Sequence, residues 1–201
     1  MGDRSFTTLC YLGVSQYADN WPYGARDNLL EAHKKNPMDV NVLYYLAKAC
    51  ARSSWKEEGI AYMNKAFDMV VPTDSMMIRL YDGLLECYKF HTKADPYEKI
   101  EVMKEAYSYT KKYTLFYQIA EIYDYQKDYV NAVHYYEKYM ALVPKNKQAA
   151  LDSEGNPLPN VDTMYQKARR RVEKIKVEDF FRNGAHDDYF EPKVIRTQTK
   201  K

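Results

Sequence analysis

Residues 113–146 have the sequence YTLFYQIAEIYDYQKDYVNAVHYYEKYMALVPKN, in which apolar and small residues follow a helical spacing. The inward positions of a first helix are Phe116, Ile119, Ala120 and Tyr123. A second helix places Ala132 and Tyr136 four residues apart, and Pro144 ends it because proline lacks the N–H that a helix interior needs. The stretch therefore predicts a helix–turn–helix unit.

The same pattern occurs twice nearer the N-terminus. In residues 6–39 the pattern positions are Leu9, Leu12 and Gly13, then Ala25, Leu29, Ala32 and Pro37. In residues 40–73 they are Leu43, Leu46, Ala47 and Cys50, then Gly59, Met63, Ala66 and Pro72. Because the small residues recur where two helices would cross, each window predicts a closely packed helix pair. The pattern positions other than the prolines are expected to face inward, and each proline is expected to end the second helix.

Residues 74–112 form a stretched version of the unit. A first helix is expected from Ser75 to about His91, which is longer than its counterparts. The second helix is expected to start at Asp95-Pro96-Tyr97-Glu98, which offers a capping carboxylate, a proline at the first helical position and an acid three residues after the cap.

Residues 147–181 predict a C-terminal cap. A short helical run at 147–151 and a loop at 152–160 are followed by a helix from about Asp162, in which Tyr165, Ala168, Val172 and Ile175 recur every three or four residues. Its solvated side would carry the cations Lys167, Arg169, Arg170, Arg171, Lys174 and Lys176. We expect Phe180 and Phe181 to pack back onto the preceding helices, and residues 182–201 to form a flexible basic tail.

This helix–turn–helix unit, with small and large side chains at fixed positions, resembles the tetratricopeptide repeat, in particular that of bacterial repeat proteins. The resemblance implies four units at about 6–39, 40–73, 74–112 and 113–146 within residues 1–146. It implies an all-α fold, in which antiparallel helix pairs stack as a right-handed solenoid with a C-terminal capping helix.

The resemblance also implies that the first helix of each unit lines a concave surface that holds an extended peptide. The corresponding positions in units two to four include Asn41, Tyr44, Lys48, Arg52, Asp82, Glu86, Tyr117, Glu121, Asp124 and Tyr125. We expect Lys48 and Arg52 to meet an acidic part of the ligand and to be reversible to Glu without loss of stability. Tyr44 and Tyr117 have an alternative role as packing residues. The first unit has Thr7, Cys10 and Val14 where a chaperone-type carboxylate clamp would begin with Lys and Asn, so a chaperone's acidic tail is not the expected ligand.

Composition argues against several function classes. The 30 Lys and Arg nearly balance the 28 Asp and Glu, giving a formal net charge of +2 and no global field for nucleic acid. We expect no transmembrane segment, because apolar runs fall far short of a membrane span. The three cysteines and four histidines lack metal-site spacing, and no nucleophile or phosphate-loop motif occurs, so no enzyme activity, metal or cofactor is expected.

The sequence therefore predicts a non-enzymatic scaffold that binds a protein or peptide. One alternative is structural self-association into a homo-oligomer, and another is an RNA-binding or enzyme-accessory protein. The resemblance favours an exported or envelope-associated bacterial protein, with a cytoplasmic one as the alternative.

Overall fold

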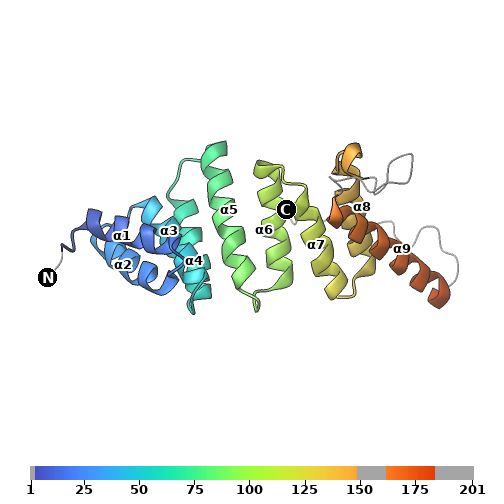
Figure 1. Ribbon diagram of the computed structural model, residues 1–201, viewed down its shortest axis with the longest axis horizontal. Coiled ribbons are helices and arrows are strands. Elements are labelled where there is room, and N and C mark those ends of the chain that lie inside the picture. Colours follow the sequence, from blue (N-terminus) through green and yellow to red (C-terminus); the bar gives the residue numbers. More distant parts are fainter. Residues whose placement is uncertain (1–2, 149–161, 184–201) are drawn as a thin grey trace, which may run out of the picture. The chain divides into compact units, whose positions relative to one another are not determined.

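The computed structural model describes residues 3–148 and 162–183, and within these residues the secondary structure is helical throughout (Figure 1). The helices are α1 Phe6–Ala18, α2 Pro22–Lys35, α3 Val40–Ala51, α4 Lys56–Asp68, α5 Asp74–Phe90, α6 Pro96–Thr110, α7 Thr114–Tyr125, α8 Tyr129–Leu142, the 3₁₀ turn η1 Lys145–Lys147 and α9 Thr163–Asn183. The predicted all-α class of helix pairs is confirmed. The chain divides into two compact units, residues 1–110 and residues 111–201, and each is described by itself.

Short polar side chains cap the starts of several helices, whereas α2, α4 and α7 begin without a side-chain cap. Asp39 Oδ1 accepts a hydrogen bond from Val42 N at 2.9 Å at the start of α3, and Asp95 Oδ1 accepts one from Tyr97 N at 2.7 Å at the start of α6. These bonds satisfy N–H groups that lack partners within the helix. The expected long helix of the third window is confirmed as α5, and the expected start at Asp95-Pro96 is confirmed by α6.

In the unit of residues 1–110, helices adjacent in sequence pack against each other, and α3 also packs against α1 and α5 (Figure 1). The close crossing within a pair depends on glycine and alanine. A Cβ atom at Gly59 would lie 2.8 Å from the carbonyl oxygen of Ala47, and one at Gly13 would lie 3.2 Å from that of Ala25. The prediction that these positions must be small is confirmed.

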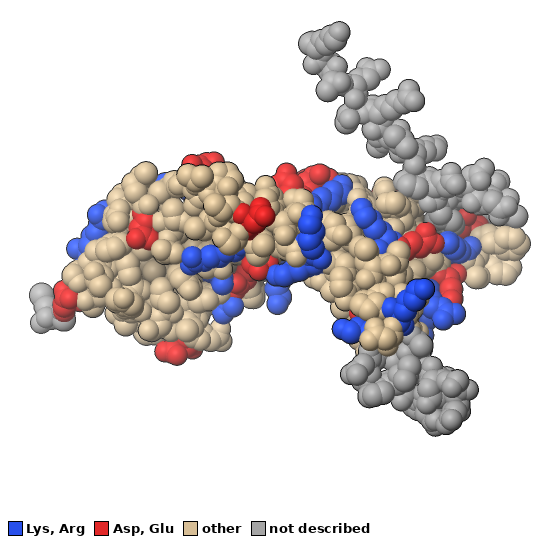
Figure 2. Space-filling view, turned by 90° about the horizontal axis from the view of Figure 1, so that it is seen from above, with Lys and Arg blue, Asp and Glu red and all other residues tan. Residues whose placement is uncertain are grey.

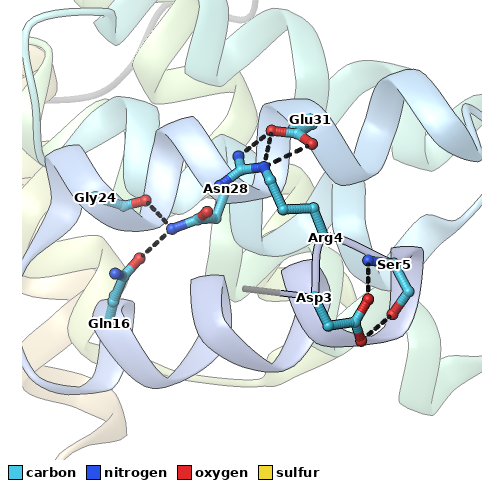
Figure 3. A network of polar contacts seen from close by, with 7 residues as sticks. All are labelled: Asp3, Arg4, Ser5, Gln16, Gly24, Asn28 and Glu31. Atoms are coloured by element: carbon cyan, nitrogen blue, oxygen red, sulfur yellow. Dashed lines mark hydrogen bonds and ion pairs between the residues drawn. The ribbon is translucent and has the colours of Figure 1, made fainter. Parts of the chain in front are cut away.

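The first pair is joined by polar contacts on α1 and α2 (Figure 3). Arg4 pairs with Glu31, and the Asn28 side-chain amide donates to Gln16 Oε1 at 2.8 Å and to the Gly24 carbonyl at 3.1 Å. Leu12 is 43% exposed, so the expectation that it packs inward is wrong. The repeat pattern assumes that a helix pair has another pair on each side. Among the described helices, α1 packs against α2 and α3, so the side of α1 that carries Leu12 has no helix to cover it.

The unit of residues 111–201 has its core between α7, α8 and α9. Tyr139 occupies a position that is usually small, yet it is fully buried, with its ring against Tyr113 and Tyr117. On α9 the apolar stripe Ala168, Val172 and Ile175 is buried against α8, which places the predicted helix as a cover for that core.

Two expectations for α9 are wrong. Phe180 and Phe181 are 56% and 81% exposed and contact each other edge to face, because the helix continues through them to Asn183 instead of turning back. Arg171 lies inward and pairs with Asp124, so it does not belong to the solvated row of cations.

The helical run predicted at 147–151 overlaps η1 at Lys147. The rest of that run, the loop at 152–160 and the tail from residue 184 lie outside the described residues.

No helix in the described ranges is both long enough and apolar enough to cross a membrane.

Candidate partner-binding surface

An ionic cluster joins three first helices of the unit of residues 1–110. The Glu86 carboxylate on α5 pairs with the Lys48 ammonium of α3 at 3.0 Å and with the guanidinium of Arg52, the residue that caps the end of α3, at 2.6 Å. Tyr17 on α1 donates its hydroxyl to the same carboxylate at 2.6 Å. The Arg52 guanidinium also stacks on the Tyr17 ring, 4.4 Å from its centroid. Three of the predicted site residues are therefore brought together, around a tyrosine that the sequence analysis did not select.

The cluster is largely withdrawn from water, and this governs its protonation. Burial alone would raise the pKa of Glu86, but the bonds from Tyr17, Lys48 and Arg52 outweigh burial and hold it below its usual value. Burial alone would lower the pKa of Lys48, yet Glu86 outweighs it and raises that pKa. Both groups are therefore charged at neutral pH. We therefore expect the reversal of Lys48 and Arg52 to Glu to lower stability, contrary to the expectation from the sequence, because three carboxylates would then meet in one place.

Asn41 and Tyr44 make a second group of contacts on α3. Arg79 on α5 donates to Asn41 Oδ1 at 2.9 Å and lies over the Tyr44 ring at 4.5 Å from its centroid. Tyr44 is only 8% exposed and packs edge to face against Tyr45, so its ring is mainly a packing element. Asp82, one helix away on α5, is half-buried.

The predicted residues of α7 divide into buried and exposed ones. Burial and then the Glu121 carboxylate raise the pKa of Tyr117 to about 12, and its ring packs against Tyr139. Asp124 receives two hydrogen bonds from Arg171 of α9, each 2.6 Å long. Tyr125 is 86% exposed. Asp124 is thus engaged within its own unit, while Tyr125 faces solvent.

A pocket of ≈ 250 Å³ lies between α1 and α3. Its lining consists of Phe6, Thr7, Cys10, Tyr11, Val14, Leu29, Asp39, Asn41, Val42 and Tyr45. Of the predicted site residues it includes Asn41 alone. Burial and then the Asp39 carboxylate raise the pKa of Cys10, so its thiol is neutral and lines the pocket as a small apolar group. The pocket was missed because the row Thr7, Cys10, Val14 was considered only for a charged clamp.

Within the described residues, no group of three or more His, Cys, Asp or Glu side chains is placed to hold a metal ion. On the face seen in Figure 2, acidic and basic side chains are interspersed among uncharged ones.

No family model and no curated protein matches the sequence. Solved structures do match. The crystal structure of MamA is similar at a TM-score of 0.56 and 17% identity over 92% of this chain and 98% of that one. A tetratricopeptide repeat protein from Parabacteroides merdae is similar at a TM-score of 0.61 and 13% identity, over 88% of this chain and 62% of that one. The chain has the tetratricopeptide-repeat fold.

A Podosopora anserina protein with nearly identical tetratricopeptide-like repeats gives the same result, at a TM-score of 0.56 and 14% identity over 92% of this chain and its own full length. Because the sequence identities are low, these similarities establish the fold and not the function. The ionic cluster and the α1–α3 pocket lie mainly on α1, α3 and α5, which the predicted division makes the first helices of their pairs. The division into four numbered units stays a prediction, as does the set of peptide-binding residues.

Proposed function

We propose that this chain is a non-enzymatic scaffold that binds an extended segment of a protein partner on the first helices of residues 1–110. The α1–α3 pocket carries the proposal, because its lining combines apolar and polar side chains. Peptide-recognition sites need these two properties together: a cavity for a side chain, and groups that bond the peptide backbone.

The pocket suits an apolar side chain of the ligand. Phe6, Val14 and Tyr45 offer apolar surface. Asp39 and Asn41 also line the pocket, and because Asp39 Oδ1 accepts from Val42 N and Asn41 Oδ1 from Arg79, the second carboxylate oxygen of Asp39 and the Asn41 amide N–H groups are the polar groups left for a peptide backbone. Nearby on the same helices, the two cations Lys48 and Arg52 face the single carboxylate of Glu86. This excess of one positive charge favours an acidic residue in the ligand, in keeping with the expectation from the sequence.

The proposal can be tested by capture of proteins from the native host. Thr7 is exposed and lines the pocket, so Thr7→Trp should fill it without disturbing the core. Ser15→Trp on the same helix, exposed and outside the pocket, is the matched control. We expect the partner to be captured by wild type and Ser15→Trp and lost with Thr7→Trp, with circular dichroism unchanged. Equal capture by all three proteins would contradict the proposal.

Self-association is a second candidate, which exposed aromatic side chains favour. Tyr11 and Trp21 are 74% and 58% exposed in the first pair, and Phe181 is 81% exposed on α9. Apolar surface of this kind is used in contacts between copies. Sedimentation at increasing protein concentration distinguishes the candidates, because self-association raises the mean mass without any added partner.

A further inference from the structure

A second pocket, of ≈ 340 Å³, lies among α4, α5 and α6 of the unit of residues 1–110. Its lining consists of Asn64, Phe67, Asp68, Tyr81, Leu84, Tyr88, Glu98, Val102 and Glu105. None of these residues lines the α1–α3 pocket, so the two sites can be altered independently.

Aromatic rings form the interior of this pocket. Tyr81 and Tyr88 are 8% and 1% exposed, and the Phe67 ring lies 4.9 Å from that of Tyr81, at an interplanar angle of 59°. Tyr109 stacks on Tyr81 at 5.3 Å and holds its ring in place. Because both tyrosine rings are buried, the ring surface open to a ligand is that of the half-buried Phe67. The face of an aromatic ring carries negative potential and attracts cations.

Three carboxylates surround the rings. The hydroxyl of Tyr88 donates to Glu98 at 2.6 Å, and that of Tyr81 donates to Glu105 at 3.1 Å. The third acid, Asp68, is exposed at the end of α4. In the part of the chain that the structure describes, no Lys, Arg or His lines the pocket, so its lining has an excess of three negative charges.

The kind of cation follows from the spacing of these acids. The described carboxylates do not converge closely enough to hold a metal ion. A planar guanidinium has five N–H donors in a fork that can reach separate carboxylates, and its face stacks on aromatic rings. A pocket of this volume also holds the aliphatic part of a long side chain.

We propose that this pocket binds an arginine side chain of a protein partner, at a site separate from the α1–α3 pocket. Electrostatic complementarity and ring stacking supply the recognition: the three carboxylates of the lining select the charge, and the half-buried ring of Phe67 offers a face for the flat delocalised group. The scaffold would thus have two recognition sites on different helices, one for an apolar side chain and one for arginine.

The test uses the full-length chain labelled with ¹⁵N and a Gly-Arg-Gly peptide blocked at both ends. Backbone amide shifts are followed by NMR as the peptide is added. We expect the largest shifts on the parts of α4, α5 and α6 that line the pocket. The same peptide with citrulline in place of arginine is neutral and nearly isosteric, and we expect it to cause no comparable shifts.

The decisive variant is Glu98→Gln combined with Glu105→Gln. Each glutamine keeps an oxygen that can accept the tyrosine hydroxyl, so the charge is removed while the local geometry is retained. Because two partly exposed charge interactions are lost, we expect the arginine peptide to bind roughly tenfold more weakly. Glu101→Gln on the same helix is the matched control, since Glu101 pairs with Lys104 outside the pocket. It should bind the peptide as wild type does.

Several results would overturn the proposal: equal binding of the citrulline peptide, undiminished binding by the double variant, or shifts located on other helices. Shifts at the pocket with spermidine but none with the arginine peptide would also overturn it, in favour of a small polyamine. If the double variant does not fold, Asp68→Asn replaces it, and unchanged binding by that exposed variant would count against the site. Because the α1–α3 pocket shares none of these residues, failure here leaves the Thr7→Trp test unaffected.

Discussion

Glu86 is the central residue of the ionic cluster in residues 1–110. One carboxylate accepts a lysine, an arginine and a tyrosine hydroxyl from two other helices. A half-buried carboxylate with three donors is stable as an anion, and its removal leaves the two cations facing each other without a counter-charge. The cluster therefore both ties α1, α3 and α5 together and sets the charge that a ligand would meet.

Glu86→Gln should lower the free energy of unfolding by about 2 kcal/mol at pH 7, because hydrogen bonds to a charged group are lost and two cations stay partly buried. Urea unfolding measures the loss. Glu101→Gln removes an exposed carboxylate from the surface pair with Lys104 and should change stability by no more than about 0.5 kcal/mol. A loss for Glu86→Gln no larger than that of the control would show that the cluster contributes nothing to stability.

The stability effect of Glu86→Gln is expected to depend on pH. Since the pKa of Glu86 is lower in the folded protein than in the unfolded chain, its stabilising effect is complete above the unfolded value, about 4.3. That effect is lost as pH falls through the lower folded value. The stability difference between wild type and Glu86→Gln should therefore shrink below about pH 4.5. A difference that stays constant on acidification would contradict this assignment.

At the scale of the helix pair, the two glycines at positions 59 and 24 should respond differently to the same change. A Cβ at Gly59 meets backbone atoms of α3 at 2.8 Å and 3.1 Å, which cannot move without separating the helices. At Gly24 it meets only the side chain of Trp21, which is 58% exposed and free to shift. Gly59→Ala should cost about 1 to 3 kcal/mol in chemical denaturation. Gly24→Ala should be neutral or stabilising by up to about 1 kcal/mol, because alanine favours helix. Equal effects would argue against the close crossing of α3 and α4.

The docking of α9 can be tested with two adjacent arginines. Arg171 makes a bidentate pair with Asp124 of α7, whereas Arg170 is exposed. Arg171→Ala should destabilise the unit of residues 111–201 by about 2 to 3 kcal/mol, because the half-buried Asp124 loses its partner. Arg170→Ala should change it by less than about 0.5 kcal/mol. Thermal melting followed by circular dichroism compares the two, and identical melts would mean that the Arg171–Asp124 pair does not stabilise α9.

At the scale of the whole molecule, each compact unit contains one histidine that folding keeps neutral. Burial and then Lys65 lower the pKa of His33 on α2, and burial and then Lys138 lower that of His134 on α8. Because the folded pKa lies below the unfolded value of about 6.5, the unfolded chain binds more protons at mildly acidic pH. Stability should therefore be complete above about pH 6.5 and fall as pH decreases below it.

Replacing both histidines by glutamine should reduce this acid sensitivity. The measurement is the drop in melting temperature between pH 7.5 and 5.5, for wild type and for the double variant. We expect a smaller drop for the variant, since Gln binds no proton in this range. Drops of equal size would assign the acid sensitivity to other groups.

The sequence by itself determined the helices and their crossings. Local signals were sufficient for these features, because a small residue at Gly59 or Ala132 is needed by contacts within one helix pair, and Asp95 caps a helix that begins beside it. The same local pattern misplaced Leu12 and Phe181. Whether a side chain on a regular helix is covered depends on a neighbouring element, and that neighbour is not encoded next to it in the chain.

Only the tertiary structure decided what the charged positions do. Lys48, Arg52 and Glu86 were selected one at a time as inward positions, but their mutual pairing depends on how α3 and α5 pack against each other, and these helices are distant in sequence. Asp124 was expected to meet a ligand and instead meets Arg171 of α9, 47 residues later. Both pockets escaped sequence analysis for the same reason. A cavity is formed by side chains from several helices, and its shape exists only once the helices have packed.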